Sequence, residues 1–268
     1  MNKDEVLSGN MNSVVRRGDH VHRPVGLWTP AVHSLLRHLE SKQLEGIPRV
    51  VGFDEVGREV LTFIEGESGA DLSSWVWDTD TLKQVGEWLR DYHRSVADFQ
   101  EPRGSTWRMC WAPQAPGEII CHFDVAPRNL ILRPNGRIAI IDFEVAAPGD
   151  ARLELGKVCN NFLAFSETDA QIDLSESAQR LHTILKGYGW REPTQIVSWM
   201  IEATTHSYKR IERAAEEGDA ALRALLDSGK IDHLLTIHSW LLDHQWEFEH
   251  ALSLEARSNQ SGTTQSGA

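Results

Sequence analysis

The fold of this chain is decided by residues 117–150, which read GEIICHFDVAPRNLILRPNGRIAIIDFEVAAPGD. Two apolar runs rich in β-branched residues, 130–133 and 138–141, flank an Asn135-Gly136 pair. An Asn-Gly pair between such runs is a strong signal for a β-hairpin with a two-residue turn. The sequence therefore predicts an antiparallel hairpin here, preceded by a short strand at 119–121.

A two-residue turn would also fix which residues of the hairpin face each other. Arg133 would face Ile138, and further along the same ladder Asn129 would face Asp142. Directly opposed residues have Cβ atoms roughly 4.5–5.5 Å apart. An amide oxygen and a carboxylate at that spacing can share a hard cation such as Mg²⁺. Asp124 lies five residues before Asn129 and is expected beside this pair.

The same stretch carries a motif, H-x-D-x-x-x-x-N over 122–129, followed after the hairpin by D-F-E over 142–144. In combination these residues resemble the catalytic loop and metal motif of the aminoglycoside phosphotransferase family. The resemblance covers roughly residues 8 to 250. It implies an α+β, bilobal protein-kinase-like fold with a small antiparallel-sheet N-terminal lobe and a larger, mainly helical C-terminal lobe.

The resemblance implies a kinase that moves the γ-phosphoryl group of ATP or GTP to a hydroxyl of a small molecule. Asp124 would orient the hydroxyl and accept its proton, while Asn129 and Asp142 would hold Mg²⁺ against the triphosphate. Arg128 would touch a phosphate during catalysis, or else be a solvated or salt-bridged arginine. His122 is expected to hydrogen-bond the loop and not to carry a proton.

The nucleotide side of the implied site departs from the family. Arg23 stands where the family has a strand lysine, and an arginine can hold phosphate through two nitrogens. Residues 8–12 stand where a glycine-rich loop should cover the phosphates, but they contain one glycine. The backbone near Phe63, Ile64 and Glu65 would hydrogen-bond the edge of the nucleotide base.

The helix that should supply a glutamate partner for the strand cation is also atypical. Val32 or His33 occupies the place where glutamate is usual, and Glu40 comes about two turns later. A residue two turns along a helix lies about 11 Å away, so Glu40 is not expected to reach Arg23. The sequence leaves open which residue replaces this glutamate.

Hydrophobic periodicity divides the chain into a nucleotide-covering lobe, a catalytic and acceptor-binding lobe, and a tail. Residues 1–66 read as a small sheet carrying one helix with Thr29 as its N-cap. A Gly-rich linker at 65–69 spans the boundary with the second lobe, residues 67–255, which contains helices at 81–100, 194–217 and 231–252. Residues 256–268 are rich in Ser, Gly, Thr and Gln and are expected to be disordered.

Composition narrows the class of partner. The 268 residues include 27 basic and 39 acidic ones, which gives a formal net charge of −12. Such a surface repels nucleic acid and anionic membranes and suits a cationic acceptor, although a merely solvated acidic surface explains the charge equally well. Three cysteines and the lack of a long apolar run favour a cytoplasmic protein without disulfides.

Two classes of function are compatible with these residues. The first is a small-molecule O-phosphotransferase acting on an aminoglycoside-like compound, and hence conferring antibiotic resistance. The second is a non-catalytic or weakly catalytic immunity or ligand-binding protein that keeps the kinase-like fold. The intact Asp124, Asn129 and Asp142 favour the enzyme, whereas the single-glycine loop and the missing lysine favour the binder.

Overall fold

The computed structural model describes residues 5–7, 14–110, 115, 117–163, 165–166, 171–229 and 231–261. The chain forms two compact units, each built from two stretches of sequence. Unit 1 contains Met1–Leu72 and Asp91–Gly149, and unit 2 contains Ser73–Arg90 and Asp150–Ala268. This division differs from lobes at 1–66 and 67–255, because the hairpin segment clusters with the N-terminal sheet and not with the helices.

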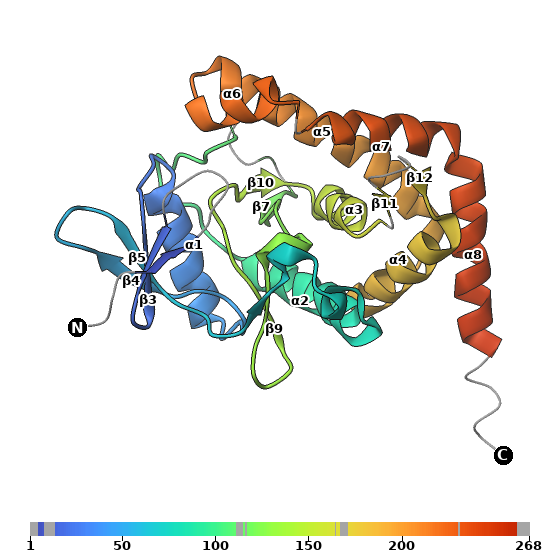
Figure 1. Cartoon of the computed structure of the whole chain (residues 1–268), viewed down its shortest axis with the longest axis horizontal. Coiled ribbons are helices and arrows are strands. Elements are labelled where there is room, and N and C mark those ends of the chain that lie inside the picture. Colours follow the sequence, from blue (N-terminus) through green and yellow to red (C-terminus); the bar gives the residue numbers. More distant parts are fainter. Residues whose placement is uncertain are drawn as a thin grey trace. The chain divides into compact units, whose positions relative to one another are not determined.

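Unit 1 contains a five-stranded antiparallel sheet with the order β1-β2-β3-β5-β4. Its strands are β1 (Glu5–Leu7), β2 (Val14–Arg17), β3 (His20–Arg23), β4 (Val50–Phe53) and β5 (Glu59–Thr62). Helix α1 (Thr29–Ser41) connects β3 to β4 and lies beside the sheet (Figure 1). The buried side of α1 carries the apolar residues whose spacing predicted the helix, which are Val32, Leu35, Leu36 and Leu39.

The start of α1 differs slightly from the prediction. Trp28 occupies the N-cap position and makes no side-chain capping bond, while Thr29 is the first helical residue. The Thr29 hydroxyl instead accepts a hydrogen bond from the backbone N–H of Gly26, at 3.0 Å. Thr29 therefore fixes the turn that leads into the helix.

The remaining strands of unit 1 surround the motif. They are β6 (Glu67–Ser68), β7 (Ile119–Cys121), β8 (Leu130–Leu132), β9 (Ile138–Ile140) and β10 (Ala147–Gly149). They form a three-stranded sheet in the order β6-β8-β9 and a two-stranded sheet of β10 and β7. The expected linker at 65–69 thus contains a short strand, β6, which pairs with β8; a 3₁₀ helix, Gly69–Asp71, follows it.

The hairpin exists, but its predicted register is wrong by one residue. Leu132 pairs with Ile138, not with Ala139. The backbone N–H of Arg133 donates to the carbonyl of Arg137 at 3.0 Å, so the loop has three residues, 134–136.

The sequence of the loop explains this register. Gly136 donates to the carbonyl of Arg133, which closes a turn with Pro134 and Asn135 at its centre. Proline favours the second position of a type I turn, and Gly136 then takes a left-handed conformation with φ of 74°. The Asn135 side chain accepts from the N–H of Arg137 at 3.0 Å and stabilises the longer loop.

Unit 2 is mainly helical. Its helices are α2 (Thr79–Val96, of which residues up to Arg90 belong to this unit), α3 (Ala151–Asn161), α4 (Leu174–Tyr188), α5 (Ile196–Glu216), α6 (Ala220–Asp227), α7 (Asp232–Asp243) and α8 (Gln245–Ser261). Two short 3₁₀ helices, Ser74–Trp77 and Pro193–Gln195, and the strand pair of β11 (Phe165–Ser166) and β12 (Gln171–Ile172) complete it. Helix α5 packs against α3, α6 and α7, while α4 packs against α8 (Figure 1).

Two predictions at the C-terminal end need correction. The single helix expected at 231–252 is divided at His244 into α7 and α8. Helix α8 then continues to Ser261, so the first residues of the expected disordered tail are helical. Among the residues that the structure describes, no helix is long and apolar enough to span a membrane.

Candidate active site

The loop after β7 holds Asp124 in a fixed backbone conformation. The backbone N–H of Asp124 donates to Nδ1 of His122 at 3.1 Å. His122 is fully buried, and its ring lies 4.3 Å from the ring of Phe143 between centroids. His122 thus makes the hydrogen bond within the loop that was expected of it. Its ring contact with Phe143 connects the loop to the segment that follows β9.

The carboxylate of Asp124 is oriented by two nearby side chains. The Asn129 amide donates from Nδ2 to Oδ2 of Asp124 at 2.6 Å and to its backbone carbonyl at 2.8 Å. Arg128 donates from Nη2 to Oδ1 of the same carboxylate. A 3₁₀ turn, Pro127–Asn129, brings both partners back toward Asp124. Each carboxylate oxygen keeps a further lone pair that could accept from a substrate hydroxyl.

Asp142 reaches the site from the end of β9 by a different route from the one predicted. The N–H of Ile141 donates to the carbonyl of Asn129 at 3.0 Å, so Ile141 and not Asp142 lies opposite Asn129. Asp142 then adopts a left-handed conformation with φ of 68° and leaves the strand. Its Oδ1 accepts from Nη1 of Arg23 at 3.1 Å, which brings the predicted nucleotide-binding arginine to the predicted metal ligand.

The oxygen ligands present suit Mg²⁺. Because Nδ2 of Asn129 donates to two oxygens of Asp124, its Oδ1 is available to a cation. Asp142 adds a carboxylate that is 34% exposed. Among the described residues no group of three His, Cys, Asp or Glu side chains could hold a metal ion. Mg²⁺ is commonly held by one or two carboxylates together with substrate phosphates, so this sparse set fits it.

A buried ion pair behind Asp142 was not predicted. Glu144 pairs with Arg108 at 2.5 Å, and both side chains are almost fully buried. Arg108 also lies over the ring of Trp28, at 4.6 Å from its centroid. Burial raises the pKa of Glu144, and the charge of Asp142 raises it further, while Arg108 acts in the opposite direction. Glu144 belongs to the D-F-E triplet noted in the sequence, but no pattern around Arg108 indicated that it would pair with Glu144.

Arg23 has a second partner that the sequence did not reveal. Its Nε donates to Oε2 of Glu59, which is buried on β5. Glu40, the distant helix glutamate, pairs with Arg49 instead, at 2.8 Å. The only feature of the sequence that could have indicated this partner is the place of Glu59 in a strand, next to apolar residues. The predicted phosphate-covering loop at 8–12 lies outside the described residues.

The predicted hinge residues are placed at the end of β5. The N–H of Phe63 already donates to the carbonyl of Asp19 at 2.8 Å, which makes this N–H unavailable to a nucleotide base. Glu65 pairs with Arg16, whose guanidinium lies 3.7 Å from the centroid of the Phe63 ring. Base contacts by Phe63, Ile64 and Glu65 therefore stay a prediction, and for Phe63 only its carbonyl could take part.

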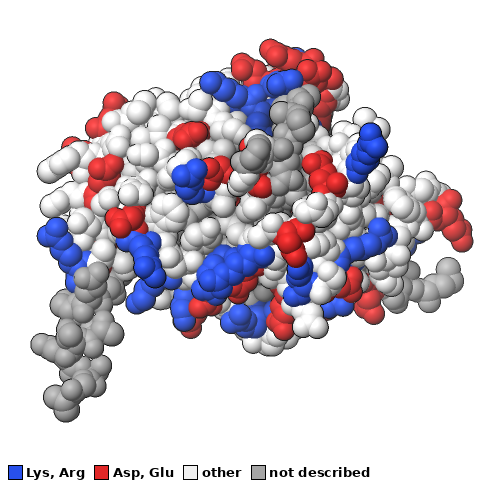
Figure 2. Space-filling view, turned by 180° about the vertical axis from the view of Figure 1, so that it is seen from behind, with Lys and Arg blue, Asp and Glu red and all other residues white. Residues whose placement is uncertain are grey.

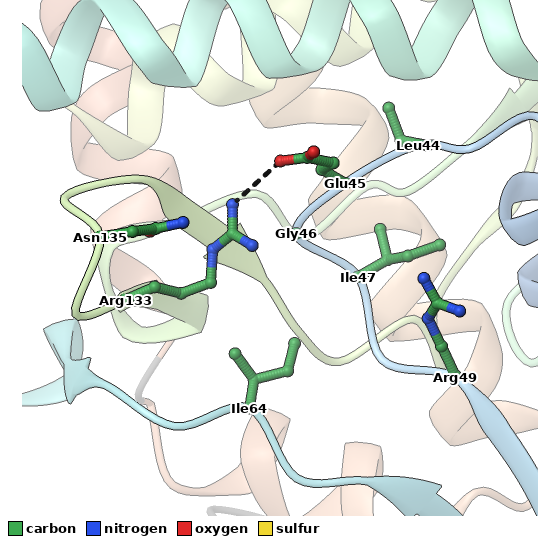
Figure 3. Close-up of a pocket in the computed structure, with 8 residues that line it drawn as sticks. All are labelled: Leu44, Glu45, Gly46, Ile47, Arg49, Ile64, Arg133 and Asn135. Carbon is green, nitrogen blue, oxygen red and sulfur yellow. Dashed lines mark ion pairs between the residues drawn. The ribbon is translucent and has the colours of Figure 1, made fainter.

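Ile64 lines a cavity of about 340 Å³. Figure 3 shows Arg133 turned toward Glu45, with which it pairs at 3.5 Å. The other lining residues are Leu44, Gly46, Ile47, Arg49 and Asn135. Neither Asp124 nor Asp142 lines this cavity, so it is separate from the carboxylate site.

Known proteins are similar to this chain in sequence and in fold. Residues 76–195 match the phosphotransferase enzyme family known as APH. In an alignment 272 positions long, the chain is 34% identical to the trifolitoxin immunity protein of Rhizobium leguminosarum bv. trifolii, and the alignment covers 94% of this chain and 100% of that protein. The chain belongs to the APH phosphotransferase family. Family membership supports phosphotransferase activity.

Solved structures agree with the fold of this APH-family protein. A choline/ethanolamine kinase family protein from Mesorhizobium loti superposes with a TM-score of 0.58 at 17% identity, over 94% of this chain and 92% of that one. The gentamicin complex of APH(2")-IIa gives 0.57 at 17% identity, over 87% and 91%. An amicoumacin kinase in complex with AMP-PNP, Ca²⁺ and Ami gives 0.59 at 12% identity, over 86% and 87%. These likenesses confirm the expected fold class.

Proposed function

We propose that this APH-family protein is a Mg²⁺-dependent phosphotransferase that moves the γ-phosphoryl group of ATP or GTP to a hydroxyl of a small, cationic molecule. The observation that carries the proposal is the orientation of the Asp124 carboxylate by Arg128 and Asn129. A buried turn that only capped the backbone would not need two side chains on one partly exposed carboxylate. The structures of kinases bound to AMP-PNP and GDP support nucleotide use.

The proposed reaction places each residue in a defined role. The hydroxyl oxygen of the acceptor attacks the γ-phosphorus, and the bond from that phosphorus to the β-bridging oxygen breaks, which releases a nucleoside diphosphate. Asp124 orients the hydroxyl and accepts its proton, which then passes to solvent. Phosphoryl transfer has a loose transition state, so the main contribution of Asp124 is to position the acceptor.

Asp142 and Asn129 would hold Mg²⁺, and Arg23 would bind the phosphates. Mg²⁺, when bound, would neutralise charge on the phosphate oxygens. Asp142 and the Oδ1 of Asn129 would be its protein ligands, and Arg23, which donates to Asp142 at 3.1 Å, would donate to the phosphates as well. Arg128 is 49% exposed at its side chain, so it could move from Asp124 to a phosphate oxygen during turnover.

A second function is favoured by one specific observation, the likeness to a trifolitoxin immunity protein over nearly the whole chain. In this alternative the protein confers immunity by binding a toxin without phosphorylating it. The same likeness makes a toxin a candidate acceptor of the phosphotransferase. The two functions differ in whether Asp124 must accept a proton.

Replacement of Asp124 by Asn separates the two functions. Asn keeps the size of the side chain but cannot accept the proton, so turnover should fall on the order of 10²–10⁴-fold while nucleotide affinity is kept. Nucleoside diphosphate release would be measured with amino-sugar, peptide-antibiotic and choline-like acceptors and with trifolitoxin. The matched control is Asp98→Asn, the same chemical change at an exposed carboxylate paired with Lys42.

Protection of toxin-sensitive cells gives the second measurement. Cells that express wild-type protein and survive, while cells with folded Asp124→Asn die, would support immunity by phosphoryl transfer. Equal protection by both proteins would show that binding suffices. Wild-type turnover by the Asp124→Asn enzyme would refute the role assigned to Asp124.

A further inference from the structure

The side chain of Arg23 is anchored from behind by a carboxylate of the neighbouring strand. Arg23 on β3 and Glu59 on β5 are direct cross-strand partners. Nε of Arg23 donates to Oε2 of Glu59, and the two side chains are only 13% and 2% exposed. A buried, charge-assisted bond between facing strand residues leaves the guanidinium few orientations.

The other oxygen of Glu59 links this pair to helix α1. His33 lies on α1 with its side chain 3% exposed, and its Nε2 is 2.8 Å from Oε1 of Glu59. The Glu59 carboxylate therefore bridges β3 and α1, with each oxygen bonded to a different element. Burial alone would raise the pKa of Glu59, but the His33 bond and the charge of Arg23 outweigh it and lower that pKa.

The outer end of Arg23 contacts a carboxylate that is more exposed than Glu59. Nη1 is 3.1 Å from Oδ1 of Asp142, whose side chain is 34% exposed, while Glu59 lies in the interior. Glu59 and Asp142 accept from Nε and Nη1, so the Nη2 donors of the fork can meet a phosphate oxygen beside Asp142.

We propose that Glu59 is the positioning residue for Arg23, taking the role for which the related fold uses a glutamate of the helix. His33 supplies the contact with α1 that this glutamate would otherwise make. The inference rests on the proposed function, because it assumes that Arg23 meets the triphosphate. Without its anchor, Arg23 would have to give up side-chain entropy whenever a nucleotide binds.

The test compares Glu59→Gln with wild-type protein by calorimetry, using ATP and GTP with Mg²⁺ and the nucleosides adenosine and guanosine. The glutamine side chain is of similar size but lacks the charge that holds Arg23. Triphosphate affinity should fall on the order of tenfold, with nucleoside affinity unchanged. Glu40→Gln is the matched control, since it neutralises an α1 glutamate paired with Arg49 at the surface, and it should change neither affinity.

A double-mutant cycle separates positioning from support of the sheet. If Glu59 acts through Arg23, Glu59→Gln should cost little further triphosphate affinity once Arg23→Ala is present. A full additive loss, or equal losses for triphosphate and nucleoside, would overturn the inference.

A second variant keeps the inference testable if Glu59→Gln fails to fold by circular dichroism. His33→Ala then replaces it, since it removes one partner of Glu59 and leaves Arg23 in place. We expect a smaller loss of affinity for the triphosphate and none for the nucleoside. If triphosphate affinity is unchanged in His33→Ala, the inference is overturned. If wild-type protein binds no nucleotide at all, the proposed function fails together with the inference. If wild type binds and Glu59→Gln binds equally well, the inference alone fails.

Discussion

Two carboxylates bind Arg23, and their surroundings give them different uses. Glu59 is 2% exposed and bonded at both oxygens, so it can only hold its partners in place. Asp142 is 34% exposed and lies beyond the end of β9 in a left-handed conformation. The left-handed region is costly for residues other than glycine, and such strain is concentrated at functional sites. At the scale of single residues, Asp142 is therefore the more exposed of the two carboxylates and the one for which we propose a role as a metal ligand.

Asp142→Asn tests this use of Asp142. The change removes a formal charge from the proposed Mg²⁺ site, so affinity for Mg²⁺·ATP should fall by at least about tenfold. In EDTA the same change should leave ATP affinity equal or higher, because one negative charge near the phosphates is gone. Calorimetry with and without Mg²⁺ measures both effects, and Asp98→Asn serves as the control. Unchanged affinity in Mg²⁺ would remove Asp142 from the site.

At the scale of elements, two glycines let helices α2 and α4 approach closely within unit 2. A Cβ atom on Gly86 would lie 2.0 Å from the backbone oxygen of Ile184, and one on Gly187 would lie 2.3 Å from that of Lys83. Arg90 adds a bond from Nη1 to the carbonyl of Gly187 at 2.9 Å. The backbones are thus in contact where these helices cross, so neither glycine can be replaced without moving a helix.

Replacing Gly86 by alanine should have two opposite effects on the stability of the protein. Helix propensity alone would stabilise the protein by about 1 kcal/mol. The clash with the α4 backbone should cost about 1–3 kcal/mol or more, because backbone atoms cannot rotate away. The free energy of unfolding in urea should therefore fall.

The control for this change is Lys83→Ala on the same helix. The Lys83 side chain is 59% exposed, so its loss should change stability by less than about 0.5 kcal/mol. A Gly86→Ala protein as stable as wild type would show that α2 and α4 are not packed this closely.

At the scale of the whole molecule, the formal net charge is −12. Figure 2 shows acidic and basic side chains interspersed on one face. Helix α5 carries exposed acidic residues, including Glu202, Glu212 and Glu216. His206 on the same helix has its pKa lowered to about 4, first by burial and then by Arg210 and Lys157, so it adds no positive charge near pH 7.

The charge predicts how acceptor binding responds to salt. Carboxylates that line an acceptor site attract ammonium groups, and salt screens exposed charges beyond about 8–10 Å. Acceptor KM should therefore rise with salt concentration for the best acceptor found. The control is an uncharged acceptor that binds equally well at low salt, because its KM should not change with salt concentration. A best acceptor that carries no amine, or a flat profile, would leave the acidic surface as a solubility feature only.

Local sequence determined much of this protein. The small N-terminal sheet, helix α1 and the 122–129 loop were expected from neighbouring residues, and the structure has each of them. Asp150 caps α3 and accepts from the N–H of Arg152, two residues along the chain, at 2.7 Å. Hydrogen bonds between residues a few positions apart are encoded in the segment itself, so these features were readable without a tertiary structure.

Tertiary structure decided what depends on pairing across the chain. The turn at Pro134 gives a loop of three residues and not two. Because of this one extra residue, Asn129 lies opposite Ile141 and not opposite Asp142. Glu59 became the partner of Arg23 because β5 pairs with β3 across 36 positions of sequence. Register and strand order are set by the summed packing of many residues, and a shift of one residue changes every partner. The sequence by itself thus determined which chemical groups this protein carries, and only the folded chain decided which of them meet.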